Sequence, residues 1–382
     1  ILAVGITGSA GPKKPARHCR TTCLLFLIHY VIHHADCQPD HFLTCLRERS
    51  ATVNMRTILG FTLLFSFALD TAIAEPIVIR FSHIVAEQTP KGSGAARFKQ
   101  LVEEKLAGRV KVEVFPRAEL YNDDEVFIAL LNNDIQLAAP SLSKFSTITK
   151  ALEVYDLPFL FNDQAAVERF QNGAAGRQLL NALDDKGLKG LGYWPNGMRV
   201  ISANKPLRSP ADLRALTLRI EPSKVIATQY ERLGAIPIKL SFGHTGDALR
   251  RELVDGQENS WSNIYSQGFQ TLQTHITETN HSFQGYMLIT SQTFWNGLPP
   301  DVRGELDTIL AQVTAEVKVQ AAEQASRDRQ AIIAAGKPKL IALTEAEQAQ
   351  WRQAMTPVWT LFAKRIDPAI MAAAQAANHP GP

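Results

Sequence analysis

Short β-branched runs alternate with stretches of helical periodicity from residue 76 onward, and this alternation most constrains how the chain can fold. Residues 76–82 (PIVIRFS) are rich in β-branched side chains, and residues 109–115 (RVKVEVF) alternate apolar and polar side chains. The run 95–106 between them has apolar residues on one helical face, and a helix at 124–132 and an apolar strand at 135–139 follow. This order is typical of βαβ units, so we expect an α/β fold with a mostly parallel sheet.

A second series of the same kind begins near Gly187. We expect strands at 188–193, 198–202, 216–220, 235–240 and 285–291, and helices at 223–233, 245–252 and 301–335, with further helices after Thr344. A chain of 382 residues has room for two domains of roughly 100–200 residues each. Because no Pro-rich linker separates the two series, we expect two lobes between which the chain passes more than once.

The first 74 residues differ from the rest in composition. Seven of the 40 basic and four of the 37 acidic residues lie there, so the remainder is electrically neutral. All the cysteines lie there as well, at Cys19, Cys23, Cys37 and Cys45. Their spacing lacks the paired short intervals of a structural zinc site, so we do not expect one.

The pattern that begins at Met55 predicts a secretory signal peptide. Met-Arg precedes a mostly apolar stretch at 57–69, and residues 72–74 (AIA) form a small-x-small ending before residue 75. The apolar stretch is shorter than the roughly 20 residues that span a bilayer. We expect 1–54 to be upstream sequence translated in error, 55–74 to be the signal peptide, and the rest to be periplasmic. The alternative is an internal apolar helix at 57–69.

The chain lacks the motifs that would indicate an enzyme. It contains no G-x-S-x-G, P-loop, H-E-x-x-H or strand-linked G-x-G-x-x-G sequence. His275 and His281 are six residues apart and share no helical face, and Asp255 and Glu258 have no nucleophile near them in sequence. The neutral balance after residue 75 also gives no electrostatic footprint for nucleic acid. We therefore expect no catalytic residue, metal, cofactor or nucleic-acid partner.

Side chains suited to binding anions lie in or near several expected strands. Arg199 follows a Gly turn and an aromatic residue in WPNGMR, and Arg219 lies inside the otherwise apolar strand LTLRI. A guanidinium is a planar fork that binds a carboxylate through two hydrogen bonds, which Lys cannot reproduce. The run 255–259 (DGQEN) adds amide and carboxylate groups beside a Gly. From the pattern alone, Arg219 either faces solvent or closes a cleft and pairs with a carboxylate.

Six collinear motifs resemble the periplasmic solute-binding subunits of tripartite ATP-independent periplasmic (TRAP) transporters, in the branch that binds C4-dicarboxylates. The motifs are IRFSHIVAEQTPKG at 79–92, RVKVEVFPRAELYNDDE at 109–125, DLPFLFND at 156–163, GYWPNGMR at 192–199, LRALTLRIEPSKV at 213–225 and LVDGQEN at 253–259. The resemblance implies a two-lobed periplasmic-binding-protein fold with a ligand cleft between the lobes and a long helix spanning both. It assigns 75–195 mainly to the first lobe, 196–290 mainly to the second, and 291–382 to the spanning and C-terminal helices.

The resemblance also implies which residues bind the ligand. Arg219 stands where the family has the Arg that forms the main salt bridge to a ligand carboxylate, and Arg199 matches the Arg that assists it. Asn259 resembles an amide ligand of the same carboxylate. Phe242 matches an aromatic residue that packs on the ligand.

Two further candidates and two departures complete the comparison with the family pattern. His83 and Lys91 are candidates for the far end of the ligand, or else a capping His and a solvated Lys. The family commonly has a Glu where His244 stands, and a Gly where Glu252 stands. The change at His244 puts in doubt any ligand or lid contact that the Glu makes in the family. The change at Glu252 is expected to affect only a turn.

We therefore expect a non-enzymatic protein that captures a small organic acid, and the branch of the family that it resembles implies a C4-dicarboxylate. It would deliver the acid to the small and large membrane subunits of a permease driven by an ion gradient. The alternative is a periplasmic sensory protein that presents the same ligand to a receptor kinase. Neighbouring permease genes would favour transport, and a kinase gene alone would favour sensing.

Overall fold

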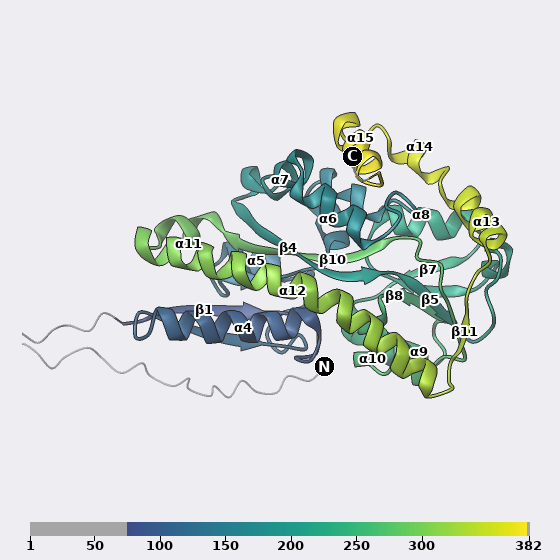
Figure 1. The fold of residues 1–382 in the computed structure, drawn as a ribbon, viewed down its shortest axis with the longest axis horizontal. Helices are drawn as coiled ribbons and strands as arrows, with labels where there is room; N and C mark the ends of the chain where they lie inside the picture. The colour runs from purple at the N-terminus through teal and green to yellow at the C-terminus, as the bar shows by residue number, and fades with distance from the viewer. Residues whose placement is uncertain (1–74, 380–382) are drawn as a thin grey trace, which may run out of the picture. The chain divides into compact units, whose positions relative to one another are not determined.

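Two β-sheets organise residues 75–379, the part of the chain that the computed structural model describes (Figure 1). The first sheet has the strand order β2-β1-β3-β10-β4. Strands β1 (Ile77–Ser82), β2 (Val110–Phe115) and β3 (Leu137–Ala138) are parallel, whereas β10 (Phe283–Ser291) is antiparallel to β3 and β4 (Leu188–Met198). The predicted βαβ order is confirmed. The predictions for residues 1–74 lie outside the described residues.

Helix α4 (Pro90–Lys105) shows how the first unit forms. Its N-cap Thr89 accepts a hydrogen bond from the Gly92 N–H at 3.2 Å, and Pro90 suits the first turn, where its missing N–H would have no helical partner. The helix therefore begins earlier than the apolar periodicity predicts. Phe98 on its buried face packs edge-on against Phe81 of β1, with ring centroids 6.3 Å apart.

The second sheet has the strand order β11-β9-β5-β8-β6-β7. Its strands are β5 (Val200–Ala203), β6 (Thr217–Ile220), β7 (Ile236–Lys239), β8 (Gly256–Asn259), β9 (His275–Thr277) and β11 (Lys339–Ile341). Strand β6 is parallel to β7 and β8, while β5 is antiparallel to β8 and β9. Helices α8 (Lys224–Arg232) and α9 (Thr245–Arg250) follow β6 and β7 as predicted. The pattern predicts neither β9 nor β11, because three residues are too few to show a periodicity.

The chain passes directly from one sheet to the other. Strand β4 of the first sheet ends at Met198 and β5 of the second begins at Val200, so Arg199 alone lies between them. Strands β9 and β10 make the return passage. Strand β10 therefore belongs to the first sheet, although all but its last residue falls within the range 196–290. Each sheet is consequently built from segments that are separate in the sequence.

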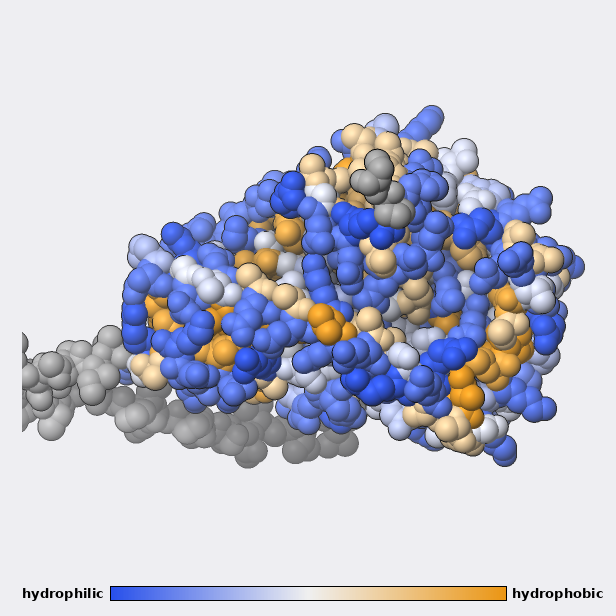
Figure 2. All heavy atoms as spheres, in the orientation of Figure 1, coloured by the Kyte–Doolittle hydropathy of each residue, from blue (hydrophilic) through white to orange (hydrophobic). Residues whose placement is uncertain are grey.

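Helix α12 (Pro300–Ala334) runs past both sheets (Figure 1). It contacts α4 and strand β4 of the first sheet, and it contacts α10 (Trp261–Ser266) beside the second sheet. Val317 is fully buried, while Val319 is 61% exposed. The face along which α12 runs is mostly hydrophilic, with separate hydrophobic patches (Figure 2). The long spanning helix is therefore confirmed.

The C-terminal helices pack against both halves of the molecule. The helices not yet named are α5 (Val126–Leu131), α6 (Gln164–Asn172), α7 (Ala174–Leu180), α11 (Gln292–Gly297), α13 (Glu345–Met355), α14 (Val358–Phe362) and α15 (Pro368–Ala376). Helix α15 contacts α6 and α7, and α14 contacts α8. Within residues 75–379, no helix combines the length and apolarity that crossing a membrane requires.

Candidate functional site

Charged side chains are buried where the two sheets meet. Arg199 lies between β4 and β5, Arg219 lies in β6 and Glu221 directly follows β6, and each is at most 5% exposed. Ser141 and Ser143, at the start of the short helix η2 (Leu142–Thr147), contact the same groups from the side of the first sheet. A buried ion is costly unless it is paired and hydrogen-bonded, so the partners of each group indicate its role.

The protein itself satisfies most of the Arg199 guanidinium. Its Nη1 donates to Glu258 Oε1 at 2.8 Å, and its Nη2 donates to Glu221 Oε2 at 2.7 Å and to Ser143 Oγ at 3.0 Å. Its Nε donates to the Phe283 carbonyl at 3.3 Å. Burial disfavours this cation, but Glu258 and Glu221 outweigh burial and raise the pKa of Arg199. One Nη1–H remains for the carboxylate that Arg199 is predicted to assist.

Glu258 extends this network. Its Oε2 accepts a hydrogen bond from the Tyr230 hydroxyl at 2.9 Å and lies 2.9 Å from His281 Nε2. His281 Nδ1 in turn lies 2.7 Å from Thr279 Oγ1. Although burial opposes it, Arg199 and His281 lower the pKa of Glu258. Glu258 and His281 are thus held in a structural hydrogen-bond network, and residues 75–379 contain no cluster of three or more potential metal ligands.

Glu221 is a buried carboxylate that the sequence analysis did not single out. Its Oε2 accepts hydrogen bonds from Arg199 Nη2 at 2.7 Å and from Ser141 Oγ at 2.8 Å. Burial favours its neutral form, but Arg199 and Arg219 prevail and lower its pKa to about 2. The signal that could have found it is its spacing of two from Arg219, which places both side chains on one side of an extended strand.

Arg219 is fully buried, which excludes the solvent-facing alternative. Its Nε and Nη2 donate to the Leu240 carbonyl at 3.0 and 2.8 Å. Its Nη1 is buried and has no hydrogen-bond partner among residues 75–379. Burial lowers the pKa of this guanidinium, yet Arg keeps its charge in proteins. The backbone therefore orients one edge of Arg219 and leaves the two Nη1–H groups for another acceptor.

Phe242 and Asn259 are both buried, in different surroundings. The centroid of the Phe242 ring lies 6.0 Å from Arg219 Cζ. Asn259 Oδ1 accepts a hydrogen bond from Asn263 Nδ2 at 2.7 Å, and its Nδ2 donates to Gln257 Oε1 at 3.3 Å. The structure thus places Phe242 beside Arg219, whereas neighbouring side chains already hold most of the Asn259 amide.

His83 and Lys91 are buried on the side of the first sheet, so Lys91 is not solvated. Lys91 Nζ donates to the Ala139 carbonyl at 2.9 Å and lies 3.6 Å from the centroid of the Tyr286 ring. Both ring nitrogens of His83 are buried without a partner in the described part of the chain. Burial and Lys91 lower the pKa of His83 to about 3, and burial lowers that of Lys91 to about 8. At neutral pH His83 is therefore uncharged.

Lys91 and Arg219 share Glu221 as an electrostatic neighbour. The Glu221 carboxylate opposes the lowering of the Lys91 pKa, and Arg219 is among the cations that lower the pKa of Glu221. The structure therefore brings cations from both sheets to one buried region.

The two departures from the family pattern lie outside this buried region. His244 is exposed, and its Nδ1 lies 2.8 Å from Ser241 Oγ. Glu252 has a φ of 54°, in the left-handed region that favours Gly. A Gly would fit this position without strain, so the Glu252 departure concerns a turn, as expected.

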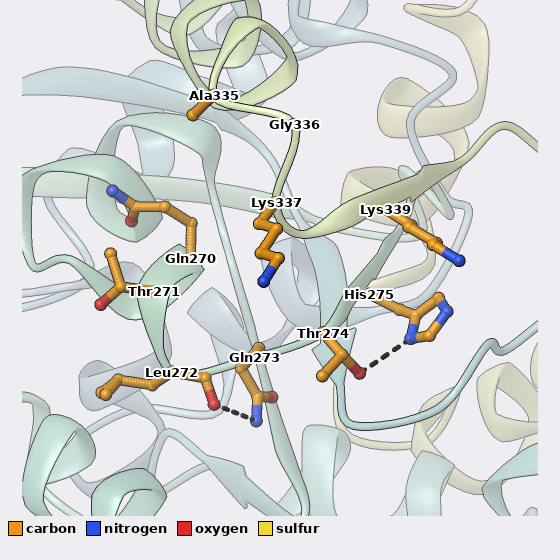
Figure 3. Close-up of a pocket in the computed structure, with 10 residues that line it drawn as sticks. All are labelled: Gln270, Thr271, Leu272, Gln273, Thr274, His275, Ala335, Gly336, Lys337 and Lys339. Carbon is orange, nitrogen blue, oxygen red and sulfur yellow. Dashed lines mark hydrogen bonds between the residues drawn. The ribbon is translucent and has the colours of Figure 1, made fainter.

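A surface pocket of about 710 Å³ is lined by a different set of residues (Figure 3). Its walls come from residues 270–275, the end of α12 and the start of β11, with Lys337 and Lys339 among them. It contains none of the six predicted ligand-binding residues and none of the buried charges where the sheets meet. We therefore take the buried charged region as the candidate site.

Comparison with known proteins gives matches that cover this region. A family model described as bacterial extracellular solute-binding protein, family 7, matches residues 81–365. The C4-dicarboxylate-binding periplasmic protein DctP of Shewanella loihica is 47% identical over 305 residues, covering 80% of this chain and 91% of that protein. The DctP protein of Rhodobacter capsulatus is 42% identical over 315 residues, covering 82% and 95%.

Solved structures have the same fold. A TRAP periplasmic solute-binding protein from Shewanella oneidensis with bound succinate has a TM-score of 0.79 and 47% identity, covering 80% of this chain and all 100% of that one. Another from Pseudomonas aeruginosa, with bound L-malate, has a TM-score of 0.73 and 45% identity, covering 75% and 100%.

Proposed function

Because the chain belongs to family 7 of the bacterial extracellular solute-binding proteins, we propose that it captures a C4-dicarboxylate in the periplasm and delivers it to a TRAP-type permease. The family consists of substrate-binding transport proteins and is not a family of enzymes. The observation that carries the proposal is the buried Nη1 of Arg219, which has no acceptor among residues 75–379. A ligand carboxylate supplies the counter-charge and the acceptor oxygens that this group lacks.

The contacts of each predicted residue support a particular role in binding the ligand. Arg219 binds one carboxylate through Nη1 while Phe242 packs on the ligand beside it. Arg199 and Asn259 each keep one N–H that the described residues leave unused, which suits an assisting contact. The second carboxylate lies toward Lys91 and His83, whose amine and ring nitrogens have unused hydrogen-bonding capacity.

Delivery to the small and large subunits of a permease follows from the family and from the names of its relatives. These relatives are described as TRAP solute-binding or C4-dicarboxylate-binding proteins, which supports transport rather than presentation to a receptor kinase. Proteoliposomes that hold the permease should take up labelled ligand only when this protein and an ion gradient are both present. Uptake that is the same without the protein would contradict the proposal.

We also propose that the chain is cleaved after Ala74 during export, so that the exported protein lacks any of residues 1–74 that are translated. The family is extracellular, and the signal pattern that begins at Met55 ends at Ala74. Mass spectrometry of exported protein should give an N-terminus at Glu75. Exported protein that retains Cys19 or Cys45 would contradict this cleavage.

A ligand screen on the protein from residue 75 tests the function most directly. Succinate, L-malate and fumarate should each be compared with propanoate, which has a single carboxylate. A ligand at 100 times its Kd raises the free energy of unfolding by about 2.7 kcal/mol when it binds only the folded state. We expect a rise in melting temperature with one or more dicarboxylates and none with propanoate. No shift with any dicarboxylate would overturn the proposed ligand class.

A further inference from the structure

We propose that Gln284 accepts a hydrogen bond from a ligand hydroxyl, so that this chain prefers hydroxylated C4-dicarboxylates; the inference rests on the function proposed above. Gln284 lies in β10 and is 1% exposed. Its Nε2 donates to Ser141 Oγ at 3.1 Å, while its Oε1 is buried and has no partner among residues 75–379. A buried acceptor without a donor is costly, so this oxygen calls for a group that carries a proton.

The contacts of Ser141 determine which end of the Gln284 amide is free. Ser141 has one hydroxyl proton, and Glu221 Oε2 lies 2.8 Å from its Oγ. Despite its burial Glu221 is ionised, since Arg199 and Arg219 lower its pKa to about 2, so it can only accept that proton. Ser141 Oγ must then accept a hydrogen bond from Gln284, and only the amide nitrogen can donate one. The free end of Gln284 is therefore its carbonyl oxygen.

Contacts through Ser141 link Gln284 to both cationic ends of the candidate site. Through Ser141 it is joined to Glu221, the electrostatic neighbour of Arg219. Ser141 also forms a β-bridge with Tyr286, over whose ring the Lys91 amine lies. A dicarboxylate that extends from Arg219 toward Lys91 therefore passes Gln284 with its middle carbons.

The chemistry of the ligand follows from this position. At neutral pH the carboxylates of succinate are ionised, so they accept hydrogen bonds and donate none. Its methylene groups donate none either, so succinate leaves Gln284 Oε1 unpaired. A hydroxyl on a middle carbon, as in malate, donates to this oxygen. Asn196 Oδ1 and the neutral His83 ring are further buried groups without a partner in the described chain, and they suit the same hydroxylated ligand.

Calorimetry with L-malate, D-malate and succinate on the protein from residue 75 tests the proposal. The parent should bind one enantiomer of malate at least about tenfold more tightly than succinate, which matches the loss of one buried hydrogen bond. Gln284→Met has similar volume and no acceptor, so it should weaken malate binding about tenfold and change succinate binding less than about threefold. Gln171→Met in α6 is the matched control, because Gln171 Oε1 is also buried without a partner among residues 75–379, and both affinities should stay unchanged.

The outcomes separate this proposal from the proposed function. Equal affinity of the parent for succinate and for both malates would overturn the role of Gln284 and leave dicarboxylate binding intact. Binding of none of the three would overturn the dicarboxylate function and this proposal with it. The comparison of ligands in the parent decides the question even if Gln284→Met does not fold.

Discussion

Two groups of buried polar side chains differ in whether the protein satisfies them. In the Arg199 network (Arg199, Glu221, Glu258, Tyr230 and His281), partners lie 2.7–3.2 Å apart within the protein. In the open set (Arg219, His83 and Gln284), each side chain has a buried polar atom without a partner among residues 75–379. Burial is similar in both groups, so burial alone does not mark a binding site. The open set differs from the Arg199 network in its unused hydrogen-bonding capacity.

The two groups have different energetic roles. Removing one partner from a buried ion pair leaves an uncompensated charge, so loss of one member of the Arg199 network should destabilise the ligand-free protein. The open set costs free energy until a ligand pairs with it. Substitutions in the first group should therefore change folding, and substitutions in the second should change binding.

The largest effect is expected for Arg199→Met. The substitution leaves Glu221 and Glu258 buried without their cation, which should cost about 3–5 kcal/mol of unfolding free energy. Urea denaturation of the ligand-free protein measures it. The control is Arg97→Met, which removes a pair with Glu316 whose side chains are 34% and 33% exposed and should cost less than about 1 kcal/mol. A variant of Arg199 as stable as the parent would show that the Arg199 network is not structural.

Arg219→Ala should weaken dicarboxylate binding by about 2–5 kcal/mol, because it removes one side of a buried charge pair. This is about 30-fold to several thousand-fold in Kd. Arg219→Lys keeps the charge but loses the planar fork, and it should also bind clearly less tightly. The ligand-free variants should stay folded but melt lower than the parent, because Arg219 is fully buried, holds the Leu240 carbonyl and helps to lower the pKa of Glu221. Calorimetry checks the first expectation and thermal unfolding the second. If Arg219→Lys binds within about threefold of the parent, the carboxylate contact is assigned to the wrong residue.

His83 should make the folded protein sensitive to acid. Its pKa is lowered from 6.5 to about 3, so the folded state binds fewer protons than the unfolded state between these values. Stability therefore falls as pH drops from about 6.5 toward 3, by at most about 1.4 kcal/mol per pH unit. Burial raises the pKa of Asp156 from 3.8 to about 6, and this group has the opposite sign, with stability falling as pH rises through that range.

Denaturation of the parent and of His83→Gln from pH 4.5 to 7.5 separates the two contributions. The stability of the parent relative to that of the variant should decrease as the pH falls, because only the parent has a buried imidazole whose protonation favours the unfolded state. Asp156 is unchanged in both proteins and cancels in the difference. A difference that does not vary with pH would show that His83 is not buried in its neutral form.

The smallest expected effect is a change in size. Ser141 and Ser143 near the first sheet contact Glu221 and Arg199 near the second, and we expect these contacts to be lost when the two sheets move apart. A ligand that pairs with the open set should favour the closed state, in which the two sheets lie close together, in proportion to its differential affinity for that state. Small-angle scattering of the protein from residue 75 should give a slightly smaller radius of gyration with ligand. An unchanged radius at saturation would indicate that closure does not depend on the ligand.

Elements with a clear period could be predicted from the sequence, and elements defined by tertiary pairing could not. The alternation in 109–115 and the long helical tract of α12 carry their own signals. Strands β9 and β11 are three residues each and exist because neighbouring strands pair with them. Likewise, β10 is apolar enough to be recognised as a strand, but its place in the first sheet depends on β3 and β4.

The candidate site shows the same limit at the level of single residues. The pattern LTLRI fits a buried or an exposed Arg219 equally well, and the deciding contact is the Leu240 carbonyl, which is remote in sequence. Glu221 is two residues away from Arg219, yet its role depends on Ser141 and Arg199 from other parts of the chain. Gln284 has no signal in the sequence, because its free oxygen results from how Ser141 shares its proton.

The position of β10 also bears on when the protein can fold. This strand lies between β3 and β4 in the first sheet but comes from residues 283–291, after most of the second sheet has been synthesised. A chain that is synthesised and exported with its N-terminus first therefore holds β3 and β4 without the strand that joins them. Pairings between such distant segments form slowly. The strand order thus delays completion of the first sheet until residues 283–291 have been synthesised.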